Sequence, residues 1–367
     1  MRLFAALGLF AVVAGAAGAA TVPKVRPISV PATAVVGEPW RAVVAIAPAA
    51  RATLEARGPA TIRARLRPTR PRAGRYGATL RFARAGSWAV FVRVGKRSTR
   101  VGSVSVDVPR DPLIVDPMTI AVEPLGELLV GQLRQGDLLR IAGGRATRVA
   151  GGIGVFHVAV ADARTYVAGR DGAVYRVDGS SLARLTPPMD ASSVAVDAGG
   201  NLYVTLYVGW VKKIAPDGAV TTIAGDGTEG YTGDGGPATA AKIFHPHSLA
   251  IGRDGALYVA DTENRRIRRI DLVTGRITTF GGDVAITVSL AAGPDGSIYS
   301  ADVVRDGAGG GVTRTTPNGE TTRIVSSTLV NGVGVAGDGT VYVNEWEAKR
   351  IQRLDASTRR LEPIARG

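Results

Sequence analysis

The chain has 367 residues, of which 45% are hydrophobic, and it carries a formal net charge of +14 at pH 7. This length allows two domains, and the apolar content argues against a chain that is disordered throughout. Cysteine is absent, which excludes disulfides, thiolate metal sites and a cysteine nucleophile.

The first 20 residues predict a secretory signal peptide. Arg2 is followed by an uncharged apolar run over residues 3–17, and residues 17–20 are small, as expected before a cleavage site. The run is shorter than the ~20 residues that a transmembrane helix needs. We therefore expect residues 1–20 to be cleaved and the mature protein to have no transmembrane anchor. It is expected to be secreted or otherwise extracytoplasmic, with the cell wall as one site of association.

Residues 21–110 predict a small β-sandwich. Short runs of alternating polar and apolar residues are separated by glycine-containing turns at a spacing that is typical of such domains. The segments at residues 74–76 (GRY) and 86–88 (GSW) resemble the paired strands of secreted bacterial immunoglobulin-like domains. This resemblance implies an Ig-like fold for the domain.

The excess of basic residues is concentrated in this domain. Residues 21–110 contain 18 Lys and Arg against three acids, whereas residues 111–367 contain 26 basic and 28 acidic residues. Because side chains alternate along a strand, Arg63, Arg65 and Arg67 are expected on one face of their strand. We expect this face to contact an anionic surface such as cell-wall polymer or lipid head groups. Nucleic acid is not an expected partner, because the exported domain shows no aromatic stacking platform.

From residue 111 to residue 367 a pattern of four short strands recurs six times. In the clearest copy the strands are expected at residues 248–251, 256–260, 266–270 and 276–280, with turn residues between them. Periods near 40 residues with four strands per unit predict a β-propeller, in which each sheet buries its faces against its neighbours. The second strand of each copy recurs at residues 128–130, 165–167, 202–204, 257–259, 298–300 and 341–343.

The same copy resembles the NHL-repeat family. The residues that carry the resemblance are 257–264 (LYVADTEN), 266–271 (RIRRID) and 275–279 (GRITT), and residues 233–239 (GDGGPAT) look like an insertion frequent in bacterial members. Because the family folds as a β-propeller, six repeats imply six blades. The expected fold class is therefore all-β, with a six-bladed NHL-type β-propeller after an N-terminal Ig-like β-sandwich.

Alignment of the repeats places polar residues at equivalent positions. A ring is expected where each channel-lining strand starts, at Thr119, His157, Ser193, Ser248, Ser289 and Gly332. A second set follows the second strand, at Gln132, Gly169, Leu206, Asp261, Asp302 and Glu345.

Loops held by a rigid scaffold often carry function, so we expect a binding face here. Its candidate binding residues are Tyr207, Trp210, His245, His247, Asp261, Asp302, Glu345 and Trp346.

The histidines on this face leave an alternative open. Neutral imidazole is a common zinc ligand, and resemblance to the peptide-amidating lyases of the NHL group implies metal-binding histidines from alternate blades. His157 and His247 occupy two such positions, and Asn331 stands where the third ligand would be. The opposing interpretation is that His157 is a polar channel residue and residues 245–247 (HPH) form a rigid loop.

The acidic residues have two interpretations as well. Asp261, Asp302 and Glu345 are suited to bind Ca²⁺ or the hydroxyls of a ligand, whereas Asp261 also fits a turn-capping role.

The sequence thus predicts a secreted, non-enzymatic binding protein that recognises a protein, peptide or glycan. The alternative is a propeller lyase or hydrolase, similar to the amidating lyases or to lactonases, with catalytic His157 and His247 and a divalent metal such as Zn²⁺ or Ca²⁺.

Overall fold

The computed structural model of the chain describes residues 24–35, 39–47, 52–58, 61–70, 75–82, 86–94, 97–107, 111–161, 164–303, 310–327, 330–355 and 358–366. The signal peptide predicted for residues 1–20 lies outside them. The described chain is built from β-strands, with one short 3-10 turn at Ala238–Ala240 (η2), so the prediction of an all-β protein is confirmed. None of its helical segments has the length and apolarity of a membrane span. It divides into two compact units, Met1–Pro109 and Arg110–Gly367.

The N-terminal unit contains two sheets, named here after one edge strand each. The β6 sheet has the order β1 (Lys24–Ser29), β3 (Pro39–Ala47), β7 (Arg75–Arg81) and β6 (Arg67–Arg70). The β5 sheet has the order β2 (Thr33–Val35), β9 (Arg97–Asp107), β8 (Gly86–Val94), β4 (Ala52–Arg57) and β5 (Thr61–Arg65), with β2 and β9 parallel.

One hydrophobic core joins these two sheets. Alternate residues of β3 and β7 point inward and pack against β4 and β8. Trp40, Phe82 and Trp88 form its aromatic centre, with edge-to-face ring contacts at 5.6 and 5.0 Å between centroids. This alternation follows from the pleat of a strand with one buried face.

The expectation that Arg63, Arg65 and Arg67 share one face of one strand is wrong. Leu66 is buried in the core and ends β5, so the chain passes from one sheet to the other at this residue. Arg63 and Arg65 lie on β5, whereas Arg67 begins β6 in the opposite sheet. The alternation of exposed and buried residues continues through Leu66, but the change of sheet at this residue puts Arg67 on a different face from Arg63 and Arg65.

The C-terminal unit contains six sheets, each made of four consecutive antiparallel strands. Sheets 1 to 3 comprise β10 (Pro117–Val122), β11 (Leu128–Gln132), β12 (Asp137–Ala142), β13 (Arg145–Gly151); β14 (Val155–Ala161), β15 (Arg164–Gly169), β16 (Val174–Asp178), β17 (Ser181–Arg184); and β18 (Ala191–Val196), β19 (Leu202–Leu206), β20 (Trp210–Ile214), β21 (Val220–Ala224). Sheets 4 to 6 comprise β22 (Pro246–Ile251), β23 (Leu257–Asp261), β24 (Arg266–Ile270), β25 (Ile277–Phe280); β26 (Ile286–Ala292), β27 (Ile298–Val303), β28 (Gly311–Thr315), β29 (Thr321–Ser326); and β30 (Val330–Val335), β31 (Val341–Glu345), β32 (Arg350–Leu354), β33 (Leu361–Arg366).

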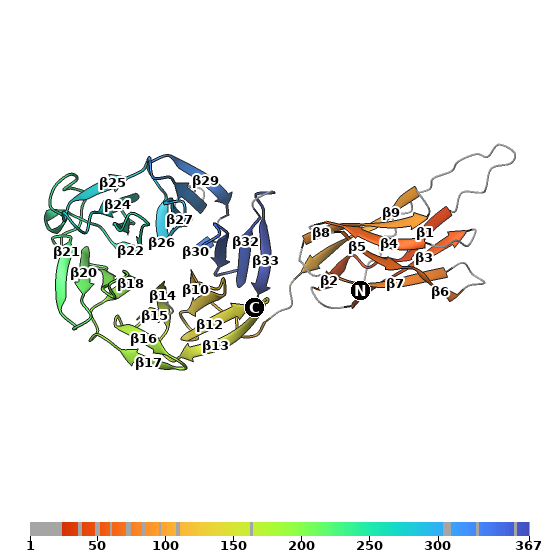
Figure 1. Cartoon of the computed structure of the whole chain (residues 1–367), viewed down its shortest axis with the longest axis horizontal. Coiled ribbons are helices and arrows are strands. Elements are labelled where there is room, and N and C mark those ends of the chain that lie inside the picture. Colours follow the sequence, from red (N-terminus) through yellow and green to blue (C-terminus); the bar gives the residue numbers. More distant parts are fainter. Residues whose placement is uncertain are drawn as a thin grey trace. The chain divides into compact units, whose positions relative to one another are not determined.

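The six sheets stand around a common centre (Figure 1). The first strand of each sheet lies innermost and contacts the first strand of the next, and β30 contacts β10 to close the circle. Each neighbouring pair of sheets shares one hydrophobic cluster, such as the one in which Tyr258 and Ile267 of sheet 4 meet Leu290 of sheet 5. A single sheet leaves both faces open to water, so burial between sheets is what stabilises the ring.

The ring closes between sheets 6 and 1 by side-chain packing and one buried hydrogen bond. Ile351 and Ala365 of sheet 6 share a cluster with Ile120 of sheet 1. Asn344 Nδ2 on β31 donates a hydrogen bond of 2.7 Å to the carbonyl oxygen of Pro117 on β10. Each sheet uses four strands that follow one another in sequence, so the closure involves no exchanged strand.

We expect Asn344→Ala to weaken this closure. The substitution leaves the buried carbonyl of Pro117 without its donor, which costs about 1–3 kcal/mol. Thermal unfolding checks the result, with Asn318→Ala in an exposed turn of sheet 5 as the matched control. Equal melting temperatures for the two variants would show that this hydrogen bond does not hold the ring closed.

Candidate functional site

The predicted ring of polar residues lies on the innermost strands, and its serines join neighbouring sheets. Ser193 Oγ accepts a hydrogen bond from the backbone N–H of Leu249 in the next sheet, at 3.2 Å. Ser248 Oγ accepts from Leu290 N at 3.0 Å, and Ser289 Oγ accepts from Val333 N at 3.3 Å. These buried hydroxyls therefore join each sheet to the next one in the ring.

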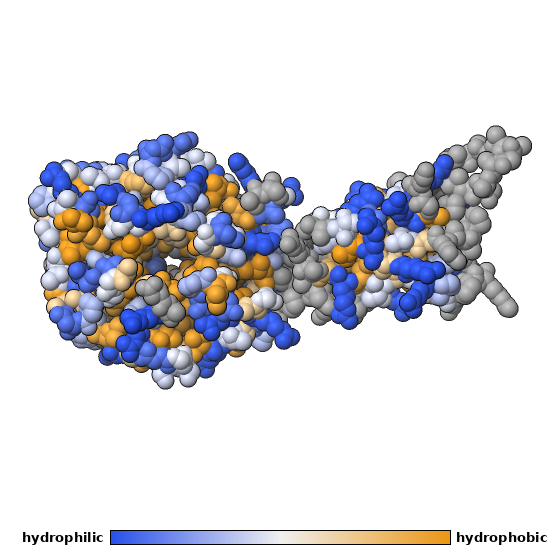
Figure 2. All heavy atoms as spheres, viewed as in Figure 1, coloured by the Kyte–Doolittle hydropathy of each residue, from blue (hydrophilic) through white to orange (hydrophobic). Residues whose placement is uncertain are grey.

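His157 of sheet 2 lies in the same ring, and its side chain contacts sheet 4 rather than the neighbouring sheet 3. Its Nε2 is 3.3 Å from Ser248 Oγ, which joins sheet 2 to sheet 4 across the inner strands. The side chain is 8% exposed, and Nδ1 has no hydrogen-bond partner among the described residues. Burial lowers the pKa of His157 from 6.5 to about 4, so the imidazole is neutral at neutral pH. The inner strands surround the opening visible at the centre of the propeller in Figure 2.

The carboxylate of Asp261 is fully buried and is held in an ion pair. Its Oδ2 lies 3.2 Å from Nη1 of Arg268, whose side chain is also 0% exposed. Burial raises the pKa of Asp261, and the hydrogen bonds from Phe244 N and Asn264 Nδ2 to Oδ1, together with Arg268, oppose that rise. Asp261 therefore binds its own loops, as the turn-capping interpretation expects.

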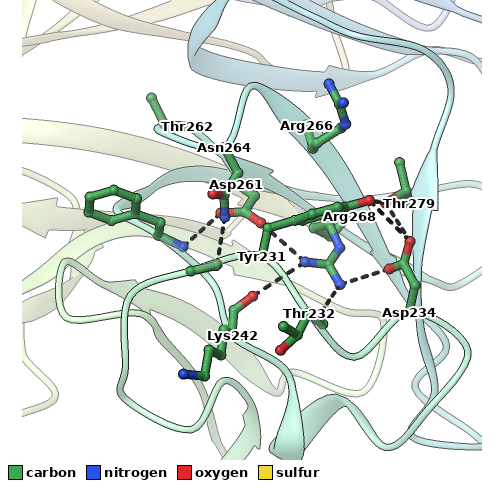
Figure 3. A network of polar contacts seen from close by, with 12 residues as sticks. Tyr231, Thr232, Asp234, Lys242, Asp261, Thr262, Asn264, Arg266, Arg268 and Thr279 are labelled. Atoms are coloured by element: carbon green, nitrogen blue, oxygen red, sulfur yellow. Dashed lines mark hydrogen bonds and ion pairs between the residues drawn. The ribbon is translucent and has the colours of Figure 1, made fainter.

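Arg268 also holds the insertion between sheets 3 and 4 (Figure 3). Nη2 donates to Asp234 Oδ1 at 2.7 Å and to the carbonyl of Thr232 at 3.1 Å. The Tyr231 ring lies 4.9 Å from the guanidinium carbon, and its hydroxyl is 2.6 Å from Thr279 Oγ1. Arg268 thus holds the insertion on sheet 4 together with backbone hydrogen bonds between residues 235–238 and residues 275–277.

Asp302 and Glu345 occupy the position of Asp261 in sheets 5 and 6 and are buried in the same way. Asp302 accepts hydrogen bonds from Thr287 Oγ1 at 2.8 Å and Thr313 Oγ1 at 2.7 Å, and burial raises its pKa. Glu345 accepts hydrogen bonds from Ser327 Oγ at 3.1 Å, Arg350 Nε at 2.9 Å and Gln352 Nε2 at 3.2 Å. Contrary to the expectation of an acidic binding face, none of the three carboxylates is exposed to a ligand.

Gln132, at the end of the second strand of sheet 1, makes the same kind of contact as Asp261 does in sheet 4. Gln132 is buried and its Oε1 accepts a hydrogen bond from Val115 N at 2.7 Å, two residues before β10. Asp261 accepts from Phe244 N, which is likewise two residues before β22. A side chain at the end of the second strand thus anchors the segment that enters the first strand.

The exposed part of this face gathers aromatic and imidazole side chains. The Tyr207 ring makes edge-to-face contacts with His247 and His245, at 5.2 and 6.4 Å between centroids, and Phe244 contacts His245 at 5.0 Å. Val208 beside them is 51% exposed. We call Tyr207, Val208, Phe244, His245 and His247 the Tyr207 patch.

Charges and protonation in the Tyr207 patch follow from its partial burial. Burial lowers the pKa of His247 and raises the pKa of Tyr207, so both are uncharged at neutral pH. The His245 side chain is 44% exposed and lies 3.9 Å from the carboxylate of Glu229, which is 66% exposed. The patch therefore combines uncharged Tyr207 and His247 side chains with the carboxylates of Glu229 and Glu263 at its edge.

The two remaining predicted aromatics lie outside this patch. Trp210 begins β20, packs against the core shared by sheets 2 and 3, and has Lys212 Nζ 4.8 Å from its ring centroid. Trp346 follows Glu345 and is half-buried, with the Arg134 guanidinium of sheet 1 at 5.3 Å. The structure thus brings together Tyr207, His245 and His247, whereas the two tryptophan rings contact other residues.

The residues proposed for a metal do not form a metal site. No group of three or more His, Cys, Asp or Glu is placed to hold an ion within the part of the chain that the structure describes. His157 Nε2 faces Ser248, and the His247 ring packs against Tyr207. Catalytic zinc needs three protein ligands, and Asn331 offers only an amide at the third position, so no catalytic step through a metal follows from this geometry.

Sequence reasoning missed the partners of the buried carboxylates. Arg268, Thr313 and Gln352 hold the same position on the third strand of sheets 4, 5 and 6. The available signal was a polar residue at the middle position of the third strand, in the same repeats that carry an acid at the end of the second strand.

Comparisons with known proteins agree with this fold. The Teneurin NHL domain family matches residues 96–271. Teneurin-3 of Mus musculus is 28% identical over 187 residues, which is 47% of this chain and 6% of that protein. The chain therefore resembles a small part of a much longer relative.

Solved structures with the same fold cover most of the chain. A protein of unknown function from Bacteroides thetaiotaomicron superposes with a TM-score of 0.52 at 15% identity, covering 90% of this chain and 97% of that one. A streptogramin B lyase superposes with a TM-score of 0.50 at 16% identity, covering 68% of this chain and 82% of that one. At such identities the likeness concerns the fold alone. With the ring of repeat sheets it supports a β-propeller fold for the C-terminal unit, and the match to the Teneurin NHL domain family over residues 96–271 supports the NHL type.

Proposed function

We propose that the chain is an extracytoplasmic, non-enzymatic binding protein of the secreted bacterial type. A six-bladed NHL propeller presents the Tyr207 patch to a protein or peptide ligand, and a basic Ig-like sandwich contacts an anionic surface. The signal-peptide pattern of residues 1–20 supports export.

The main support for this proposal is that most polar side chains of the predicted binding face make contacts within the propeller itself. The carboxylates of Asp261, Asp302 and Glu345 are buried in loop-anchoring contacts, and its serines join the sheets. General acid–base catalysis needs a titratable group within reach of a substrate, and these three carboxylates are turned inward. The exposed remainder is an aromatic surface, which is the chemistry of recognition.

Among the expected ligands, a peptide segment suits the patch best. Tyr207 and the two imidazoles supply flat apolar area together with hydrogen-bonding atoms, and Val208 adds an aliphatic contact. The Glu229 carboxylate at the edge favours a cation nearby. The preferred peptide therefore places an apolar side chain next to a lysine or arginine.

Selection from a displayed library of random peptides tests the proposal. We expect the full chain to enrich peptides that pair an apolar residue with a basic one. The Tyr207→Ala and His247→Ala variants should bind an enriched peptide at least tenfold more weakly, because aromatic anchors dominate such interfaces (about 2 kcal/mol each). Trp346→Ala, on another loop of the propeller, is the matched control. Enriched peptides that bind the Tyr207→Ala variant as tightly as the unaltered chain would refute the assignment of this patch.

A further inference from the structure

The four described strands of the β6 sheet supply cations to its outer face and contain no acidic residue. Exposed cations lie on every strand: Lys24, Arg26, Arg41, Arg67, Arg75 and Arg81. This face refines the anionic contact of the proposed function and rests on it.

The strand register explains why these side chains share a face. Trp40, Ala42 and Val44 of β3 point into the core, so Arg41 points outward. Arg26 of β1 pairs with Ala45, which pairs with Arg75 of β7, and Arg67 of β6 pairs with Gly77. Partners across a ladder project to the same side.

The β5 sheet differs because it contains a buried acid on its outer side. Arg57 Nε and Arg63 Nε donate to the two oxygens of Glu55, at 2.5 and 3.0 Å. These hydrogen bonds, that of Arg63 first, lower the pKa of Glu55. The Arg57 guanidinium also stacks on Phe91, at 4.5 Å from the ring centroid. Two cations of this sheet are therefore committed to an internal partner.

The chemistry of the β6 face indicates its occupant. Five of the six cations are arginines, whose planar forks bind phosphate oxygens in pairs. Residues two apart on a strand are separated by about 7 Å and neighbouring strands by about 5 Å, so an extended polymer is able to meet several of them at once.

Two further features of the face favour a phosphate polymer over a membrane or a nucleic acid as its ligand. Among the described residues of the N-terminal unit no large apolar side chain is exposed, whereas membrane binding gains strength from inserted apolar groups. Tyr76 of β7 is buried in the core, and the exposed residues of this face include no aromatic on which a nucleic acid base would stack.

We propose that the outer face of the β6 sheet binds an extended polymer with repeating phosphate groups. Arg41, Arg67 and Arg75 form the centre of the face. The polymer lies across β1, β3, β7 and β6 and exchanges its counterions for the guanidinium groups.

Two matched triple variants of the full chain test this proposal with long-chain linear polyphosphate as the probe. The substitutions R41Q, R67Q and R75Q alter the β6 face, and R65Q, R93Q and R100Q remove the same charge from the β5 sheet. We expect the first triple to weaken binding at least tenfold at about 0.1 M salt and to lower the slope of log affinity against log salt by about two to three. The second triple should change the affinity less than threefold. All replaced residues are exposed, so both variants should keep the melting temperature of the unaltered chain.

The remaining outcomes each decide a separate point. Equal losses in the two triples would overturn the choice of face and leave an anionic contact of the unit in place. Tighter binding to vesicles that contain phosphatidylglycerol than to polyphosphate, with the same dependence on R41Q, R67Q and R75Q, would replace the polymer by a lipid surface. Failure of the unaltered chain to bind either probe would overturn both this inference and the anionic contact in the proposed function.

Discussion

Replacing Arg268 with methionine is expected to lower the free energy of unfolding of the propeller by about 3–5 kcal/mol. Asp261 is fully buried, and Arg268 is its cationic partner at 3.2 Å. Without that partner a buried carboxylate is left uncompensated, and the insertion loses its anchor at Asp234. The loss should shrink at lower pH, because protonation of Asp261 in the variant removes the unpaired charge.

Arg269→Met on the same strand is the matched control. Arg269 pairs with Asp254 at 2.9 Å, but both side chains are partly exposed, so this pair contributes about 0–1 kcal/mol. Urea unfolding followed by tryptophan fluorescence separates the two variants. If Arg268→Met is no less stable than Arg269→Met, the buried ion pair does not hold the insertion as described.

The propeller is expected to lose about 3 kcal/mol of stability through His157 as pH falls from 6.5 to 4. Unfolded His157 takes up a proton near pH 6.5, whereas burial holds the folded pKa at about 4. Between these values the unfolded state binds more protons, so acidification favours unfolding. The gap between the two pKa values corresponds to about 3 kcal/mol.

His157→Ser removes this contribution and matches the serines at the equivalent positions of sheets 3 to 5. The variant lacks the contact with Ser248 and should be less stable than the unaltered chain at pH 7. At pH 4 that difference should fall by about 3 kcal/mol. Parallel stability–pH curves for the two proteins would mean that His157 is not held neutral in the folded chain.

The strands of the propeller were predictable because turn chemistry marks their ends. In sheet 4 the expected third strand at residues 266–270 matches β24, and the other three strands differ from expectation by one or two residues at their ends. Gly255 and Gly275 adopt positive φ in the turns that follow β22 and β24, which is the backbone freedom that glycine provides. Repetition of the pattern then revealed which residues are equivalent.

The partners of the site residues were not predictable in the same way. Alignment placed Ser193, Ser248 and Ser289 at one position, but their hydrogen-bond donors lie on the next sheet, more than 40 residues along the chain. Likewise, Asp261 looks exposed in a loop until Arg268 and the insertion cover it. Periodicity indicates which face a residue occupies, whereas burial at a given position depends on segments remote in sequence.

The buried polar side chains of the propeller also affect ligand binding, because they hold the loops around the Tyr207 patch in place. Asp261 accepts a hydrogen bond from the backbone of Phe244, so the buried acid of sheet 4 fixes the loop that carries Phe244, His245 and His247. A rigid support reduces the entropy lost on binding. His245 adopts a positive φ of 47° in this patch, a conformation that a non-glycine residue keeps only where its surroundings hold it.

Hydrogen exchange of the full chain, measured with and without a selected peptide, tests most directly whether the Tyr207 patch is the recognition surface. We expect slower exchange in the segments that carry Tyr207 and Val208 and in those around His245 and His247, with the turns on the opposite side of the propeller unchanged. Protection confined to those opposite turns, with residues 207–208 and 244–247 unaffected, would contradict the account.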